Sequence, residues 1–199
     1  CSIKEYIKFG DTYACLINPK SQLKNKNIIF GNSHAFMYGW ALKNHWLNKK
    51  QGGLIIQMNT CLPFIDKNIS IKCLNKAKAY YNSIIQSDDL KNIIIGFHWQ
   101  ENKLVDVHGN IFSDKKFNYT KKSIDNLITQ LKNNNKNVFL IGPIDIPNKD
   151  FSSQLSREII FKNKKNYKLF KSRNEFDKKY NYIIEYYVKK LDKNFLQPH

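Results

Sequence analysis

Ser33 stands where a side chain could act as a nucleophile. In NIIFGNSHAFMYGW it follows the apolar run 27–30 through Gly31 and Asn32, and a helical spacing of apolar residues begins directly after it. The amides of a first helical turn lack partners within the helix and carry the positive end of its dipole, so they can stabilise an oxyanion. Serine and asparagine are also favoured N-caps. The local pattern alone leaves both interpretations open.

Short apolar runs predict the strands that position this serine. They are rich in isoleucine or valine and do not alternate with polar residues, which is typical of strands buried on both faces of a parallel sheet. They cover residues 27–30, 53–58, 92–97 and 137–143. Segments with helical spacing separate them, a last helix is expected at about 174–191, and 194–196 resembles the opening of a fifth strand.

Strands that alternate with helices predict an α/β fold, a three-layer αβα sandwich with a central parallel sheet. We expect one domain over residues 1–199, with a polar surface excursion at 148–174. In such sheets the chemistry collects at the carboxyl ends of the strands. The loops to inspect are therefore 31–35, 59–66, 98–110 and 142–150.

Composition argues against nucleic-acid binding despite a net charge of +17. Only Arg157 and Arg173 among the 33 basic residues carry the planar guanidinium that suits phosphate and base recognition. The lysines are scattered with asparagines along the chain rather than gathered on one face. No run approaches the roughly 20 apolar residues that cross a bilayer. Because the chain begins at Cys1, we expect a processed product or a segment of a longer protein.

Four cysteines lie within the first 73 residues, and none forms a C-x-x-C pair, so no metal site is predicted. The separations fit two local disulfides, Cys1 with Cys15 and Cys61 with Cys73, which would imply an oxidising compartment. Four cysteines allow three connectivities, and four reduced cysteines remain the alternative.

A set of motifs resembles one known family. GNSHA is not the G-x-S-x-G elbow, but it resembles the G-D-S-H-A block of SGNH (GDSL-like) hydrolase domains that are fused to membrane acyltransferase-3 proteins, the O-antigen and polysaccharide O-acetyltransferases. The resemblance spans nearly the whole chain, because further motifs follow in the family's order. These are YACLINPK with Cys15, TCLP at 60–63, Cys73, NIIIGFHWQE with Trp99, and VFLIGPIDIP.

The resemblance implies an enzyme in which Ser33 is the nucleophile. It would transfer an acyl group, acetyl in this family, to a cell-surface carbohydrate, or hydrolyse an ester on it, without a cofactor. The fused membrane domain would supply the acyl donor, and the SGNH domain would be periplasmic or otherwise extracytoplasmic, tethered to the inner membrane. Thr60 and the pair His98 and Trp99 stand where the family places oxyanion donors. Trp99 could stack on a sugar ring or fill the core.

Two departures from the family motifs bear on catalysis. Asn32 replaces the aspartate of G-D-S, and we expect it to order the turn through hydrogen bonds. With Thr60, His98 and Trp99, it is also a candidate oxyanion or substrate ligand. In addition, no D-x-x-H occurs in the sequence, so the aspartate and histidine that would activate Ser33 are not present. We expect the chain to stop roughly 20 to 40 residues before that motif. The alternative function is a non-catalytic carbohydrate-binding module on the same fold.

Overall fold

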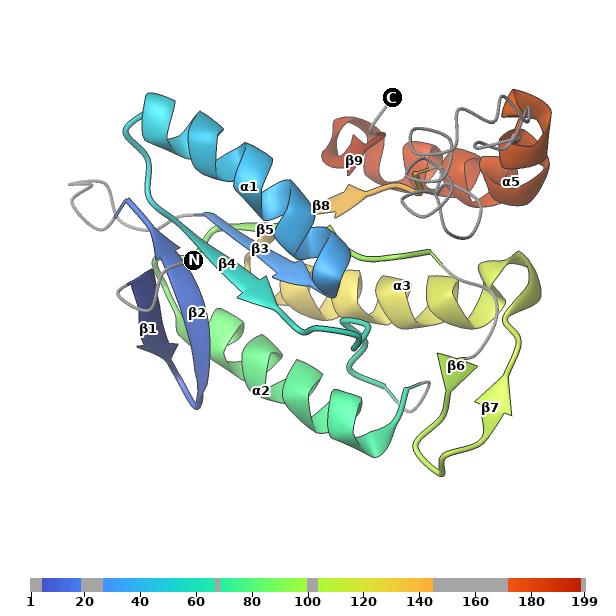
Figure 1. Cartoon of the computed structure of the whole chain (residues 1–199), viewed down its shortest axis with the longest axis horizontal. Helices are drawn as coiled ribbons and strands as arrows, with labels where there is room; N and C mark the ends of the chain where they lie inside the picture. Colours follow the sequence, from blue (N-terminus) through green and yellow to red (C-terminus); the bar gives the residue numbers. More distant parts are fainter. Residues whose placement is uncertain (1–4, 19–26, 67–68, 100–103, 145–171, 198–199) are drawn as a thin grey trace, which may run out of the picture.

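Five parallel strands form the centre of the sheet in a computed structural model that describes residues 5–18, 27–66, 69–99, 104–144 and 172–197. Two antiparallel strands extend one edge, which gives the order β1-β2-β4-β3-β5-β8-β9 (Figure 1). The parallel strands thus have the doubly wound order 2-1-3-4-5. The strands are β1 (Tyr6–Phe9), β2 (Thr12–Ile17), β3 (Asn27–Gly31), β4 (Gly53–Gln57), β5 (Asn92–Gly96), β8 (Asn137–Ile141) and β9 (Phe195–Leu196).

Helices cover both faces of this sheet and complete the predicted three-layer sandwich (Figure 1). The helix α1 (Ser33–Asn48) packs on one face, mainly over β3 and β4. The opposite face is covered by α2 (Ile71–Gln86), α3 (Asn118–Asn133) and α5 (Arg173–Leu191). Short 3₁₀ helices, η2 (Lys115–Phe117) and η3 (Asp192–Asn194), and a hairpin of β6 (Leu104–Val105) and β7 (Ile111–Phe112) complete the described elements.

Alternate strand residues belong to two separate cores. On β3, Ile28 and Phe30 face α2, α3 and α5, whereas Ile29 faces α1, and all three are fully buried. The same alternation runs through β4 and β5. Because both faces of each central strand are buried, the interior positions of these strands are all apolar, and the runs show no polar alternation.

The edge hairpin of β1 and β2 was not predicted. In β1 more and less exposed positions alternate, whereas β2 carries the apolar run 13–17, in which Tyr13 is 64% exposed. It pairs antiparallel with β4, which makes the sheet mostly rather than wholly parallel. The last predicted helix and the fifth strand are both confirmed, as α5 and β9. The predicted excursion at 148–174 falls largely outside the described residues.

One predicted disulfide is confirmed in the structure. Cys61 and Cys73 are bonded, and the bridge joins the loop after β4 to the first turn of α2. Cys15, on β2, is also disulfide-bonded, while Cys1, its predicted partner, lies outside the described residues. No helix in the described parts of the chain is both long and apolar enough to cross a bilayer.

Candidate active site

Two glycines at the ends of neighbouring strands let the first turn of α1 approach the sheet. Gly31 and Gly96 are paired across β3 and β5. Gly31 has φ 153°, and a Cβ built on it would lie 1.7 Å from the carbonyl oxygen of Gly96. A Cβ on Gly96 would lie 3.3 Å from Cα of Ala35, in the first turn of α1. The chain can therefore turn from strand into helix here only because Gly31 lacks a side chain, and Gly96 allows the first turn of α1 to pack closely on the sheet.

Asn32 caps α1, and Ser33 does not. The side-chain Oδ1 of Asn32 accepts a hydrogen bond of 3.0 Å from the backbone N–H of His34. Ser33 is the first residue of the helix, and its side chain is exposed at the carboxyl edge of the sheet. The N-cap interpretation of Ser33 is therefore wrong. Its hydroxyl is left without a capping role.

Asn32 also ties two strand ends together. The same Oδ1 accepts a hydrogen bond of 3.2 Å from the backbone N–H of His98, directly after β5, and Asn32 is buried. Both of these donors are neutral amides, and an amide oxygen can accept from them as a carboxylate would. This geometry gives Asn32 the turn-ordering role that the sequence predicted. As a candidate oxyanion or substrate ligand, Asn32 could donate only through its Nδ2 amide, since its Oδ1 is engaged by these two backbone donors.

Asn59, which the sequence did not single out, touches the candidate nucleophile. Its carbonyl accepts a hydrogen bond of 2.9 Å from the backbone N–H of Ser33. Asn59 has φ 56°, a left-handed conformation that asparagine tolerates better than most residues. Thr60 follows it and is exposed at the same edge. An asparagine directly after a buried strand was the signal that could have identified this turn.

Two stacked imidazoles lie beside Ser33. The rings of His34 and His98 are 4.8 Å apart and inclined by only 7°. Burial lowers the pKa of His34. Burial, together with the charges of His34 and of Lys179 on α5, lowers the pKa of His98 to about 4. The pair is therefore neutral at pH 7, and His98 presents an uncharged ring at the edge.

From the lowered pKa of His98 in the stacked pair, we predict that the folded chain loses stability in acid. Below about pH 6.5 the unfolded chain protonates His98 while the folded chain does not, so the free energy of unfolding falls as the pH drops from about 6.5 to 4. After discounting for partial exposure, this amounts to about 1 to 2 kcal/mol. His98→Phe, which keeps a ring for the stack, should flatten the dependence in urea titrations at a series of pH values.

His34→Phe serves as the matched variant for this prediction. It removes a neighbouring charge that lowers the pKa of His98, so the pKa of His98, followed by NMR, should rise. Equal pH dependence in wild type and His98→Phe would show that His98 titrates alike in the folded and unfolded chains.

Trp99 belongs to the core. It is 2% exposed, its Nε1 donates a hydrogen bond of 3.2 Å to the carbonyl of Ile141, and its ring packs against Phe97, Phe117 and Tyr187. Of the two roles expected for Trp99, the structure shows core packing. A sugar ring could not stack on it, because the side chain is buried.

Among the described residues, no histidine or carboxylate forms a hydrogen bond with the Ser33 hydroxyl. The sequence holds no D-x-x-H. Asp106 and His108 have a D-x-H spacing, but the Asp106 carboxylate accepts hydrogen bonds from the backbone N–H groups of His108 and Asn110, both at 2.9 Å. It therefore orders the turn between β6 and β7. Within the described ranges, no three His, Cys, Asp or Glu side chains are grouped so as to hold a metal ion.

Comparison with known proteins gives one match. The family model described as "SGNH domain (fused to AT3 domains)" matches residues 1–197. No curated protein and no solved structure matches significantly.

Proposed function

The chain belongs to the family of SGNH domains fused to AT3 domains, and from this premise we propose that Ser33 is the nucleophile of an acyl transfer. Membership supports activity of the hydrolase or acyltransferase type. One observation on the chain itself carries the proposal. Asn32 performs the capping, so the exposed Ser33 hydroxyl at the start of α1 is free of a structural task.

The proposed reaction has two halves. In the first, a histidine takes the proton of the Ser33 hydroxyl, and Oγ attacks the carbonyl carbon of an acyl donor. The donor's leaving group departs with that proton and leaves an ester on Ser33. In the second, the histidine takes the proton of a carbohydrate hydroxyl or of water, and that oxygen attacks the ester. Ser33 regains its proton, and the acylated sugar or the free acid is released.

Thr60 is the leading candidate to stabilise the oxyanion. The N–H of Ser33 donates to the carbonyl of Asn59, and the N–H of His98 donates to Asn32. Either must exchange its partner before it can serve an oxyanion, whereas Thr60 is exposed beside them. A shift of the turn at Asn59 and Thr60 would free the Ser33 amide and bring the threonine nearer.

We infer that the aspartate and histidine come from polypeptide beyond His199. The strand β9 runs parallel to β8, and Leu196 is paired with Ile141 at the carboxyl end of β8. The chain that follows β9 therefore emerges at the edge where Ser33, Thr60 and His98 lie. A short segment from that point has access to Ser33.

The acyl donor, in this proposal, is delivered by the AT3 domain to which the family's SGNH domains are fused. Such a fusion indicates a membrane-associated protein. We place the SGNH domain on the extracytoplasmic side, in the periplasm, because the Cys61–Cys73 disulfide suits an oxidising compartment. The acceptor would be a carbohydrate.

Trapping the covalent intermediate tests the proposal. The polypeptide extended by roughly 40 residues past His199 should be mixed with p-nitrophenyl acetate, quenched in acid and digested for mass spectrometry. We expect one acetyl group on the peptide that contains Ser33 and none on the peptide that contains Ser70, a serine at the start of α2. Acetyl groups spread over lysines, with Ser33 unmodified, would refute it.

A non-catalytic carbohydrate-binding module is the second candidate. The hydrogen bond from the Ser33 amide to Asn59, and the absence of D-x-x-H from the sequence, favour it. In that case, the extended polypeptide should bind oligosaccharide equally well with Ser33→Ala and form no acyl-serine.

A further inference from the structure

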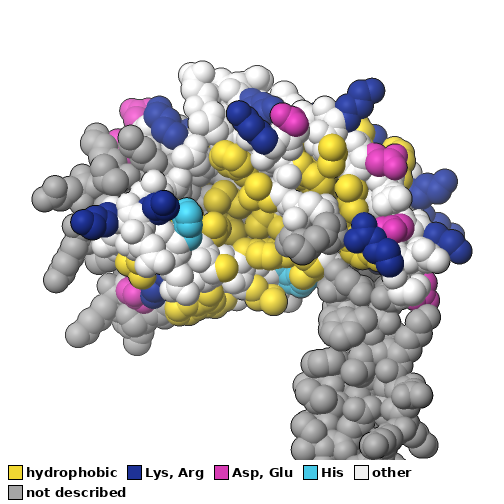
Figure 2. All heavy atoms as spheres, turned by 90° about the horizontal axis from the view of Figure 1, so that it is seen from above, with side chains coloured by type: hydrophobic (Ala, Val, Ile, Leu, Met, Phe, Trp, Pro, Cys, Tyr) yellow, Lys and Arg dark blue, Asp and Glu magenta, His cyan; other side chains and the backbone are white. Residues whose placement is uncertain are grey.

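One line of exposed side chains runs along the whole of α1 and contains three large apolar residues. The line consists of Ser33, Met37, Trp40, Asn44 and Leu47, all of them exposed. Steps of four and three residues place these side chains on one side of a helix. Met37 is 61% exposed, Trp40 45% and Leu47 41%. We call this line the outer stripe of α1. In the space-filling view, hydrophobic side chains are gathered on this side of the molecule (Figure 2).

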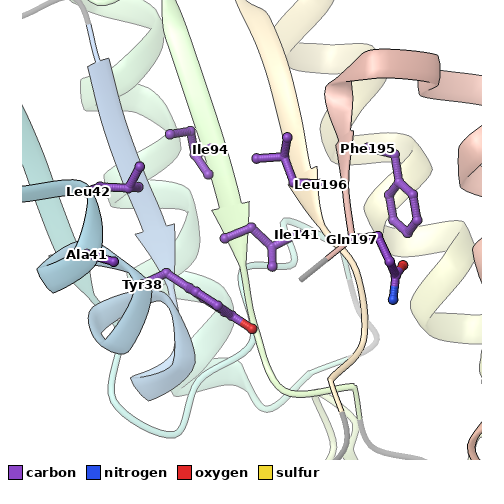
Figure 3. A pocket seen from close by; sticks show the side chains of 8 residues that line it. All are labelled: Tyr38, Ala41, Leu42, Ile94, Ile141, Phe195, Leu196 and Gln197. Carbon is purple, nitrogen blue, oxygen red and sulfur yellow. The ribbon is translucent and has the colours of Figure 1, made fainter. Parts of the chain in front are cut away.

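The outer stripe is distinct from the other apolar sides of α1. Gly39 and Trp46 are buried against β4. Tyr38, Ala41 and Leu42 line an apolar groove of about 390 Å³ beside β5 and β8 (Figure 3). Apolar side chains thus lie on three sides of this helix, whereas a surface helix that faces only water on its outer side carries polar residues there. The outer stripe is therefore suited to an apolar environment.

The charged groups of α1 are all basic. The helix and the two residues after it contain Lys43, Lys49 and Lys50 and no aspartate or glutamate. Nζ of Lys43 lies 4.9 Å from the ring centre of Trp40, and it pairs with Glu5 at 3.2 Å. The chain as a whole has a net charge of +17. An apolar stripe in basic surroundings is complementary to a partner that is both apolar and anionic.

A lipid bilayer with anionic headgroups meets both requirements. Tryptophan is favoured at the membrane interface, because its ring is apolar and its N–H is polar. A lysine beside it can place its stem along apolar surface and its ammonium group among the headgroups. Anionic lipids add an attraction for basic segments. The family's fusion to AT3 domains indicates a membrane-associated protein, so a lipid surface is close to the domain.

We propose that α1 docks on an anionic lipid surface through its outer stripe, with Met37, Trp40 and Leu47 inserted among the headgroups. Lys43 would then face the lipid phosphates. Docking does not require acyl transfer and so goes beyond the proposed function. Ser33 begins the same stripe. If it is the nucleophile as proposed, docking would hold it at the membrane surface, where the proposed acyl donor is delivered.

Tryptophan fluorescence and sedimentation with vesicles test the docking of the 199-residue chain. Trp46 and Trp99 are only 3% and 2% exposed, so a change of emission on binding reports on Trp40. We expect vesicles of phosphatidylcholine and phosphatidylglycerol to sediment the chain and to shift its emission to the blue. Phosphatidylcholine alone should bind it more weakly. Trp40→Phe should still sediment with the mixed vesicles but should lose the blue shift.

Substitutions on the outer stripe identify the face that docks. Met37→Asp and Leu47→Asp introduce a charge at exposed positions, so both variants should keep the wild-type circular dichroism. Ile111→Asp is the matched control, because it changes the net charge equally at a position that is 73% exposed, on β7 and away from α1 (Figure 1). We expect each stripe variant to lower the vesicle partition coefficient at least about tenfold, and the control to lower it less than about twofold.

Several results would overturn the docking proposal. These are no sedimentation with the mixed vesicles, binding without a blue shift, and equal effects of the stripe variants and Ile111→Asp. Binding without a blue shift that soluble dextran sulfate abolishes would indicate a site for acidic polymers instead. A dimer that the stripe variants dissociate, in the absence of vesicle binding, would make a second copy the partner.

Ser33→Ala separates docking from catalysis, because it should bind the mixed vesicles as the wild type does. Docking without an acyl-serine in the trapping experiment would refute the proposed function alone. An acyl-serine without docking would refute only the docking of α1.

Discussion

Ser33→Ala is expected to lower ester turnover by the extended polypeptide at least about 10³-fold, because the variant lacks the hydroxyl on which the proposed acyl intermediate forms. The loss should appear in kcat and in kcat/KM together, since the hydroxyl acts in the transition state rather than in binding. The measurement is release of p-nitrophenol under saturating ester, compared with the wild type.

The fold should tolerate this change. Ser33 is exposed and does not cap α1, so the free energy of unfolding should move by no more than about 0.5 kcal/mol. Ser70→Ala is the matched control, because Ser70 also lies at the start of a helix and its side chain makes no capping hydrogen bond. It should retain full activity. If ester turnover persisted in Ser33→Ala, Ser33 would not be the nucleophile, and the proposed mechanism would be wrong.

Asn32→Ala tests the capping role of Asn32 separately from the catalytic role proposed for Ser33. It removes one acceptor that serves two backbone donors, His34 N–H and His98 N–H. We expect a loss of about 1 to 3 kcal/mol in the free energy of unfolding, measured in urea. Asn32→Asp supplies an equivalent acceptor and should retain most of the stability. If the alanine variant were as stable as the wild type, the two hydrogen bonds would not order the site.

The sequence was sufficient to predict the central strands because each carries apolar side chains on both faces. Ile28, Ile29 and Phe30 are buried in two different cores, so the run could only be an interior strand. The edge hairpin has no such constraint, since β1 alternates between exposed and half-buried positions and Tyr13 on β2 is exposed. A short edge strand is defined by pairing with β4, which a local pattern does not reveal.

In the candidate site, too, the features set by local sequence could be predicted, and those set by long-range pairing could not. The position of Ser33 followed from a strand and a helix that meet at Gly31, both visible locally. The contact from Ser33 to Asn59 and the stack of His34 on His98 join segments that are distant in sequence, so they depend on strand order. Trp99 shows the limit of motif resemblance, because its burial depends on side chains from α5 and η2.

Gly31→Ala is expected to cost more than about 4 kcal/mol of unfolding free energy, which is comparable with the whole stability of a marginal domain. Two effects act together. The φ of 153° is strained for any residue with a side chain, and the new Cβ would lie 1.7 Å from the Gly96 carbonyl oxygen, so β3 and β5 must separate. The variant should be insoluble or largely unfolded by circular dichroism.

Gly109→Ala isolates the conformational part of this cost. Gly109 has φ 87° but no atom within 4 Å of a built Cβ, so alanine there should cost only about 1 to 2 kcal/mol. Gly96→Ala isolates close packing, because its Cβ would meet Ala35 and Ile141 at 3.3 Å. That variant should fold but displace the first turn of α1, and its activity should fall more than its stability. Equal losses in Gly31→Ala and Gly109→Ala would show that the approach of β3 to β5 does not require glycine.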